Sequence, residues 1–512
     1  MGRVRIQKIG LLRRLPLFLL IWGIVSFSMW IPAIYALALD DHETSRSFFY
    51  SGLLGLFVVA TISVASSNRV PRRGTLGQLA VLLGCFTVLP LFLAIPLHDA
   101  LGNTTFLNAY FDMVSALTTT GADIFPDPDR LTAPLHLWRA LVGWMGGLLM
   151  WISAAAILAP LSLGGFEITA RGQPGRPVSG VAQNEKVDPR GRLIRVTRTL
   201  TPIYAGLTAV IWLLLLVAGE QGLTAICHAM STMATSGISP VGGMEGAEAG
   251  ITGEVILFLF LFFALSRLTF STDTATSGYS RLDQDPEFRI GLIIVGSVAV
   301  LLFFRVLAGV NEIGNQMAPM QALHVIWGML FTVLSFLTTA GFESANWNDA
   351  QQLSGLGTPG LILMGLALIG GGVATTAGGV KLLRVFALYL NGAREIDRLI
   401  YPSSVSGVGG GNRRIQSDGA FIAWIFLMMF ALTAAVFNVL LSITGAGFEQ
   451  AMVLTVAALS TTGPLIELAT DVPIRLVDLS GGAKLTMCAA MVIGRLETLA
   501  IIALITPTLW RD

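Results

Sequence analysis

The sequence predicts an all-α integral membrane protein, in which two N-terminal helices precede four repeats of a helix, a half-helix, a loop and a second helix. Composition is the first observation: 54% of the 512 residues are hydrophobic, 12% are charged and the mean hydropathy is +0.73. Soluble domains carry about 25% charged residues. The other two observations are a series of long apolar segments and a small polar cluster that recurs four times. The net charge of +1 argues against a nucleic-acid partner, and we expect none.

Apolar segments give the helix count. Crossing the hydrocarbon takes about 20 apolar residues. Ten segments meet or approach that length: Leu15–Leu39, Phe48–Val64, Leu76–Leu97, Leu135–Leu161, Leu200–Val217, Val255–Leu268, Ile290–Val310, Leu356–Leu390, Ala420–Ile443 and Leu485–Thr508. Between them lie four shorter ones: Thr105–Leu117, Gly222–Met233, Met320–Leu337 and Gly447–Leu459. Three of these four are too short to span, so we interpret the set as re-entrant half-helices.

The first apolar segment has two interpretations. Basic residues precede it, and Ala36-Leu37-Ala38 resembles a signal-peptidase site. However, Leu15–Leu39 is longer than the roughly 7–15 residues of a signal-peptide core. We therefore predict a retained membrane helix.

Charge predicts the orientation, because cytoplasmic connections carry an excess of Lys and Arg. The connection 162–199 holds seven basic residues, and two further arginine groups lie at 69–73 and 394–414. The opposite connections are acidic, and all four half-helices fall on that outer side. We expect both termini in the cytoplasm and the chain in the bacterial inner (plasma) membrane, surrounded by the lipid bilayer.

The recurring cluster follows each half-helix. In every repeat a Thr lies two residues before a Gly, and the four clusters are Thr118-Thr119-Thr120-Gly121, Ala234-Thr235-Ser236-Gly237, Thr338-Thr339-Ala340-Gly341 and Ser460-Thr461-Thr462-Gly463. The predicted organisation is a two-helix extension over 1–70, repeats over 71–165, 196–275, 286–392 and 418–512, and cytoplasmic connections over 166–195 and 393–417.

These clusters have the chemistry of a cation filter. A dehydrated cation needs oxygens in place of its water, and backbone carbonyls and Thr hydroxyls supply them. Gly permits the backbone conformations that aim carbonyls at an axis. The partly negative C-terminal end of each half-helix favours a cation nearby. Ordinary helix packing explains any one cluster, but four in register favour a pseudo-fourfold pore. We call the half-helices pore helices and the clusters filters, with a cation as substrate at the filter residues.

The segment Leu356–Leu390 is too long for one span, since a helix of that length measures about 50 Å against a hydrocarbon core of about 30 Å. Its middle is rich in glycine, which predicts a broken helix with an intramembrane loop. A phosphate-binding loop is a rival, but the G-K-[ST] ending is absent. Close helix packing is a second rival. The predicted gate comprises Gly370, Gly371, Gly372, Thr375, Thr376, Gly378, Gly379, Lys381 and Arg495.

Arg495 lies near the middle of the last predicted span, where a charge is costly and is a functional candidate by default. Snorkelling to the surface is its alternative. For Lys381 and Arg384, nearer the cytoplasmic side, snorkelling or topology signalling weighs as much as function. The cysteines Cys85, Cys227 and Cys488 stand singly in apolar segments and predict inert core thiols. We expect no permanently bound cofactor.

At these residues the sequence resembles the Trk/Ktr/HKT cation transporter superfamily, and within it the TrkH family of potassium-uptake subunits. The resemblance covers nearly the whole chain. It is carried by the first and third filters, the Gly370–Lys381 run, and the end from Gly494-Arg495-Leu496-Glu497 through Thr506–Arg511.

The resemblance implies four repeats around one pore, a homodimer, and a cytoplasmic TrkA-like nucleotide-binding ring that gates the pore. It places the potassium site on the four clusters, the gating loop on Gly370–Gly379 and the pore-facing arginine on Arg495. A Gly in the first filter goes with potassium preference in this superfamily, and Gly121 fits. Two departures, Ala234 in place of a hydroxyl residue and the glycine-poor Phe263–Arg267, concern the geometry of the second repeat.

The function predicted is gated potassium uptake, and the chain is not expected to be an enzyme. A sodium or mixed sodium/potassium permease on the same fold is the alternative. A membrane-embedded hydrolase would need a Ser/His, paired-Asp or metal constellation within the spans, and none is visible in the sequence. A non-conducting sensor would not need intact filters.

Overall fold

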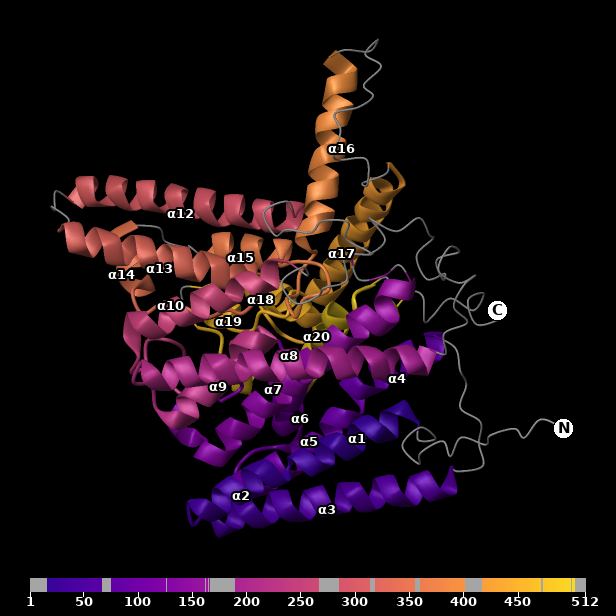
Figure 1. Cartoon of the computed structure of the whole chain (residues 1–512). Coiled ribbons are helices and arrows are strands. Elements are labelled where there is room, and N and C mark those ends of the chain that lie inside the picture. Colours follow the sequence, from indigo (N-terminus) through magenta and orange to yellow (C-terminus); the bar gives the residue numbers. More distant parts are fainter. Residues whose placement is uncertain are drawn as a thin grey trace.

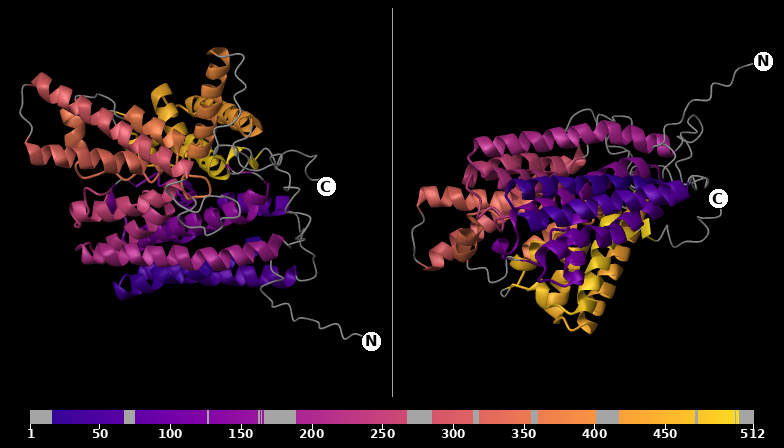
Figure 2. Two further views of the ribbon diagram at one scale, coloured as in Figure 1. Left: turned by 45° about the horizontal axis from the view of Figure 1, so that its top comes forward. Right: turned by 90° about the horizontal axis from the view of Figure 1, so that it is seen from below.

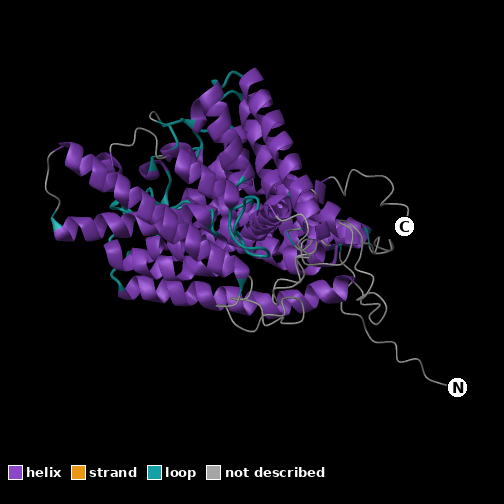
Figure 3. Cartoon of the chain, turned by 90° about the horizontal axis from the view of Figure 1, so that it is seen from above, coloured by secondary structure: helices purple, strands orange, loops and turns teal. Residues whose placement is uncertain are grey.

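The computed structural model describes residues 16–66, 75–125, 127–161, 163, 165, 189–266, 285–313, 318–354, 360–400, 417–470, 473–498 and 500–501. Within these residues every regular element is helical (Figure 3), in agreement with the predicted all-α fold. Eight helices among the described residues are long and apolar enough to cross a membrane. The chain is therefore a multi-pass membrane protein.

The N-terminal extension is an antiparallel pair. Helices α1 (Leu17–Ser28) and α2 (Trp30–Ala38) form one span, and α3 (His42–Ala65) returns beside them (Figure 1). Asp41 begins α3 by accepting a hydrogen bond from Thr44 N, the usual role of an N-cap carboxylate. Small residues let the pair pack closely, because a Cβ on Gly52 would lie 2.9 Å from Ser26 O of α1, and one on Gly55 would lie 2.3 Å from Ser26 Oγ.

Four similar groups of helices follow the extension. The first holds α4 (Thr75–Thr87), α5 (Leu89–Leu101), α6 (Phe106–Leu117), the 3₁₀ turn η2 (Pro128–Arg130), α7 (Ala133–Ser153), η3 (Ala154–Leu158) and η4 (Ala159–Leu161). The second holds α8 (Pro189–Val217), α9 (Gly222–Ala234), α10 (Gly250–Leu261) and η6 (Phe262–Leu265). The third holds α12 (Pro286–Ile313), α13 (Pro319–Leu337), α14 (Trp347–Ser354), α15 (Gly360–Ile369) and α16 (Leu382–Ile400). The fourth holds α17 (Ser417–Ile443), α18 (Phe448–Leu459), α19 (Leu465–Leu468), η9 (Leu476–Asp478) and α20 (Gly481–Leu496).

Seven of the eight long apolar helices match predicted spans, and one predicted span needs correction. The segment Pro319–Leu337 also has the length of a span, but as α13 it leads into the third filter and is the longest pore helix. The segment Leu485–Thr508 is not one helix, since α20 ends at Leu496 and Glu497 has φ +65°. The remainder of that predicted span lies largely outside the described residues.

The pore helices and α7 lie at the centre, and other long helices, among them α3, α8 and α12, lie outside them. In Figure 1 the helices α3, α8 and α12 run nearly parallel across the molecule, and Figure 2 shows the same layering from two other directions. Of the most apolar window in α7 and its continuation, 72% is buried, against 28% for α3 and for α12. A lipid-facing outer layer therefore surrounds a buried set of short helices.

Candidate ion filter and gate

Each pore helix ends in the same hydrogen-bonded turn. In the first repeat Thr120 N donates to Ser115 O, and Thr119 N donates to Ala116 O, both at 2.9 Å. This is the Schellman arrangement, in which the residue after the C-cap takes a left-handed conformation. The bond that spans five residues, Thr120 N to Ser115 O, recurs as Ser236 N to Ser231 O, Ala340 N to Ser335 O and Thr462 N to Ala457 O. The backbone therefore leaves the pore helix in the same way in all four repeats.

A threonine occupies the left-handed position in every repeat. The φ angles are +56° at Thr119, +50° at Thr235, +57° at Thr339 and +55° at Thr461. For a β-branched residue this conformation is a true outlier, costing on the order of 1–3 kcal/mol. Strain kept at four equivalent places indicates that the residue has a use there. The hydroxyls of Thr119 and Thr461 are buried and have no hydrogen-bond partner among the described residues, so they can serve as ion ligands.

The filter glycines bring neighbouring filters into contact around a closed ring. A Cβ on Gly121 would lie 1.7 Å from Ser236 O, and one on Gly237 would lie 2.4 Å from Ala340 O. A Cβ on Gly341 would lie 2.8 Å from Cγ of Pro464, which follows the fourth filter. The ring closes where Gly463 N donates to Thr120 O at 2.6 Å. Each filter thus touches the next in the order of the repeats, and no side chain fits at the glycine positions.

Ala234 departs from the hydroxyl residue expected in the second filter, and its packing gives a reason. It is the last residue of α9 and is fully buried. A Cβ on Gly147 of α7 would lie 3.0 Å from both its Cα and its Cβ. The space beside α7 therefore admits only a small side chain.

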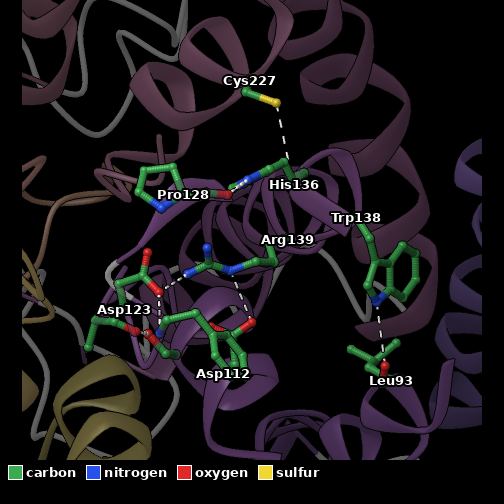
Figure 4. Close-up of polar contacts among 11 residues, drawn as sticks. Leu93, Asp112, Asp123, Pro128, His136, Trp138, Arg139 and Cys227 are labelled. Atoms are coloured by element: carbon green, nitrogen blue, oxygen red, sulfur yellow. Dashed lines mark hydrogen bonds and ion pairs between the residues drawn. The ribbon is translucent and has the colours of Figure 1, made fainter. Parts of the chain in front are cut away.

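On the outer side, an ion-paired arginine ties the first pore helix to its filter (Figure 4). Arg139 of α7 contacts Asp112 of the pore helix at 3.0 Å and Asp123 beyond the filter at 2.9 Å. Both Arg139 and Asp112 are buried, whereas Asp123 is partly exposed toward the outer mouth. A buried charge is tolerated when it is paired and hydrogen-bonded, and here the pairing fixes the exit of the filter.

The same position is polar in the next two repeats. Nine residues before each filter glycine stand Asp112, His228, Thr332 and Leu454. His228 Nε2 lies 2.9 Å from Ser239 Oγ, and Thr332 Oγ1 accepts from Ser344 N at 3.2 Å. In three repeats, therefore, a polar contact joins the middle of the pore helix to the chain just beyond the filter. The fourth repeat has the buried Leu454 instead.

Acidic side chains surround the outer mouth. Glu343 lies two residues after Gly341, and burial, with Glu245 and Glu467 nearby, raises its pKa to about 7. A carboxyl group that is partly desolvated beside like charges resists ionisation. The mouth is therefore electronegative and its charge is only partly developed at neutral pH, an arrangement that attracts cations.

The glycine-rich segment 370–381 breaks the helix as the sequence predicts. Helix α15 ends at Ile369 and α16 begins at Leu382. The loop between them lies directly against the filters: Gly378 N donates to Thr339 Oγ1 at 2.7 Å, and Thr376 Oγ1 donates to Met233 O at 3.2 Å. A Cβ on Gly378 would lie 2.1 Å from Ser460 O. The loop thus touches the second, third and fourth repeats at the inner end of the filters.

The loop is also anchored away from the filters. Gly372 N donates to Ala264 O at 3.0 Å, and Val373 N donates to the buried carboxylate of Glu287 at 3.1 Å. A phosphate loop offers its N–H groups to an anion. In the segment 370–381 seven backbone N–H groups already have acceptors, one of them a carboxylate, which argues against phosphate binding. The remaining predicted gate residues Gly370, Gly371, Gly379 and Thr375 lie within the same loop.

Three buried cations surround this loop, so snorkelling is wrong for all three. Arg495 donates to Thr376 O at 2.6 Å, and Lys381 donates to Ala377 O. Arg384 pairs with Glu497 at 2.6 Å and stacks 3.5 Å from the centre of the Phe426 ring. Arg495 lies in the last turn of α20 rather than mid-helix, but the helix is about 24 Å long, so this end stays at membrane depth.

Arg495 differs from Arg384 in its neutralisation, because Arg384 is paired with Glu497. Its exposed fraction is 3%, and it contacts no carboxylate within ion-pair distance among the described residues. Its Nε and Nη2 atoms have no hydrogen-bond partner there. An unpaired guanidinium beneath the filter raises the electrostatic energy of a cation passing close to it.

The structure thus brings the sixteen predicted filter residues together at the C-terminal ends of the four pore helices, with the predicted gate residues on the inner side of them. Sequence reasoning missed the outer contacts, although one signal was present, namely polar residues nine positions before three of the four filter glycines. It also missed Glu254, Glu287 and Glu497, which are single buried acids with no repeated spacing.

The fold and the site define a membrane cation transporter with four filter segments around one axis. The family model described as "TrkH: Cation transport protein" matches residues 251–510, and the chain belongs to this family. The Trk system potassium uptake protein TrkH of Escherichia coli (strain K12) is 31% identical over 501 residues, which cover 95% of this chain and 96% of that protein.

Two further similarities involve Vibrio parahaemolyticus. Its Trk system potassium uptake protein TrkH is 30% identical over 413 residues, which cover 80% of this chain and 81% of the relative. The crystal structure of the potassium transporter TrkH from this organism superimposes with a TM-score of 0.78 at 27% identity, covering 96% of this chain and 98% of that one.

Proposed function

We propose that this protein takes up potassium across the bacterial inner membrane through a pore lined by its four filters. One observation carries the proposal: four pore helices end in identical Schellman turns, each presenting a strained threonine and a close-packed filter to the same ring. Carbonyl and hydroxyl oxygens in that ring replace the water of a dehydrated cation. The membrane potential supplies about 2.3 kcal/mol per charge per 100 mV, enough to drive inward flow.

Potassium is preferred over sodium in this proposal. Relatives that span nearly the whole chain are named as potassium uptake proteins, and the first filter carries Gly121. The test is potassium-limited growth of a transport-deficient bacterium carrying this chain, together with rubidium and sodium flux into proteoliposomes. Growth rescue with rubidium uptake exceeding sodium uptake is expected. Equal or greater sodium flux favours the sodium or mixed permease, and no flux of either ion contradicts the proposal.

The broken helix is proposed as the gate of this pore, with Arg495 as an electrostatic barrier within it. The loop touches three repeats and the guanidinium holds Thr376 O. Helix α16 continues from the loop and projects from the body of the molecule (Figure 1), with Tyr389, Ile396 and Leu399 exposed. A partner that moved α16 would pull directly on the loop.

That partner is proposed to be a cytoplasmic TrkA-like nucleotide-binding ring, and the assembly a homodimer of this chain. The basic connections 162–199 and 391–418, which lie largely outside the described residues, are the proposed docking surface. Opposite charges steer such an encounter; plain topology signalling is the alternative. Arg413→Glu combined with Arg414→Glu should weaken co-purification with the ring, and unchanged binding would refute this surface.

A further inference from the structure

Glu254 is a fully buried acid on the outer half of the second repeat. It is the fifth residue of α10, and its exposed fraction is 0%. Buried carboxylates are costly unless their oxygens are hydrogen-bonded. The position of its partners therefore shows what the side chain does.

The hydrogen-bond partners of this carboxylate among the described residues all belong to the third repeat. Trp327 Nε1 of the pore helix α13 donates to Oε2 at 2.7 Å, and Ala345 N donates to Oε1 at 2.7 Å. Ser344 Oγ lies 2.8 Å from Oε2 and 3.0 Å from Oε1. Ser344 and Ala345 are the third and fourth residues after Gly341. One side chain of the second repeat thus joins the pore helix of the third repeat to the exit of its filter.

The partners are all hydrogen-bond donors, which matches an ionised carboxylate, an acceptor-only group. None of them is a cation. The ion pairs among the described residues involve other acids, so no cationic side chain in that part of the chain neutralises Glu254 within ion-pair distance. A negative charge held beside a filter, in surroundings of low dielectric, favours a cation in that filter.

In the first repeat a different contact joins the pore helix to the exit of the filter. There Arg139 of the same repeat joins the pore helix to the filter exit through Asp112 and Asp123. The third filter has no such internal ion pair among the described residues; its exit is held by the hydrogen bond from Ser344 N to Thr332 Oγ1 within the repeat and by Glu254 from the neighbouring repeat. Its geometry consequently depends on the contact between repeats two and three.

We propose that Glu254 is a positioning residue for the third filter and that it sets the discrimination between potassium and sodium. It does not touch the ion; it acts through Ser344, Ala345 and Trp327. The cage that distinguishes the two ions depends on where the filter oxygens lie. Loosening one exit widens the cage on that side and weakens the preference for potassium.

The test rests on the proposed function and compares Glu254→Gln with Glu220→Gln. Glu220 is a matched control, since it is also buried and accepts from backbone N–H groups, those of Glu248 and Ala249, but touches no filter. Rubidium and sodium half-saturation concentrations are measured in proteoliposomes, and thermal stability in detergent. In Glu254→Gln the half-saturation concentration for sodium divided by that for rubidium should fall roughly three- to tenfold, because a charge-assisted contact is lost. Both variants should lose stability, and Glu220→Gln should keep the wild-type ratio.

A second variant keeps the proposal testable if Glu254→Gln does not fold. Ser344→Ala removes the hydroxyl that bonds both carboxylate oxygens, and it should shift the ratio in the same direction. Combined with Glu254→Gln it should add little, because both changes remove one contact. The proposal is overturned if the ratio is unchanged in both Glu254→Gln and Ser344→Ala, or if Glu220→Gln shifts the ratio by the same amount. A wild-type protein that carries neither ion contradicts the proposed function instead.

Discussion

The filters and the segment 370–381, which is the proposed gate and is called the gate loop below, are both irregular backbone at membrane depth. The filter occurs four times in the chain and the gate loop once. Every filter has a threonine at φ of about +50° to +57° and the same turn behind it. The helix that follows the filter can be compared among the four repeats. Among the described residues, a long glycine-rich interruption occurs in this helix in the third repeat alone, between α15 and α16. Repetition yields a ring of equivalent filters, and the single departure from it is the part that we propose as the gate.

Packing is tight in both regions. A Cβ on a filter glycine would overlap atoms of a neighbouring filter or of Pro464, which follows the fourth filter. The gate loop is held by hydrogen bonds, among them those from Gly372, Val373, Gly378 and Arg495. Its glycines are also close-packed, since a Cβ on Gly378 would lie 2.1 Å from Ser460 O. Each such hydrogen bond contributes about 1 kcal/mol net. The proposed movement of the loop must therefore break such bonds and shift its glycines away from their neighbours, while each filter in the ring above keeps its contacts with two others.

The largest effect is expected at Gly121, whose conversion to Ser tests the rigid half of this comparison. The new Cβ would lie 1.7 Å from Ser236 O, and the residue has φ +69°. The first and second filters must separate, so the potassium-over-sodium flux ratio should fall by about tenfold or more, as a cost above about 1.4 kcal/mol implies.

Gly102→Ser is the matched control for Gly121→Ser. Gly102 has φ +59° but nothing within 4 Å of a Cβ, so it carries the backbone strain without the collision. Its flux ratio should equal that of the wild type. An unchanged ratio in Gly121→Ser would show that the ring is more pliable than its packing indicates.

Arg495→Ala tests the movable half and is expected to have the next largest effect. Removal of the guanidinium abolishes both the bond to Thr376 O and the charge beneath the filter. Potassium flux per folded molecule, measured without a partner ring, should rise about tenfold if the barrier it imposes is near 1.4 kcal/mol. Shortening the 370–379 loop should raise this flux as well.

The control for Arg495→Ala is Arg475→Ala, which removes an exposed arginine paired with Asp478 at 3.7 Å. Exposed pairs contribute little to stability, so flux and expression should stay the same. A structural brace predicts a different result for Arg495→Ala, with expression and flux falling together. That result would remove Arg495 from the gate.

Repetition also explains how much the sequence could predict. The four Thr-x-Gly clusters, the pore helices before them and the broken helix were predictable because each has a local or repeated signal. The contacts of Glu254 with Ser344 and of Arg384 with Glu497 were not, because they join residues about ninety or more positions apart. The early end of α20 at Leu496 was missed because the apolar composition continues beyond it. Hydropathy records burial in the membrane and does not record where a helix ends.

The smallest effect is expected where the two regions meet, at Thr339. Its Oγ1 accepts from Gly378 N at 2.7 Å, the contact that joins the third filter to the gate loop. Thr339→Val keeps the shape and the β-branch but removes the acceptor, leaving a buried N–H unpaired at a cost of about 1 kcal/mol or more. Partner-independent potassium flux should therefore rise about fivefold.

Thr461→Val separates this effect from a loss of ion ligands. Thr461 holds the equivalent place in the fourth filter with nearly the same φ, but its hydroxyl has no partner among the described residues. Its removal should raise the half-saturation concentration for potassium without changing closure of the gate, whereas Thr339→Val should change both. Flux measured over a range of potassium concentrations distinguishes them, because a looser gate raises the maximal rate and a lost ligand does not. If both variants change only the half-saturation concentration, the filter and the gate are not coupled through Thr339, and the loop must be released through Arg495 or α16 alone.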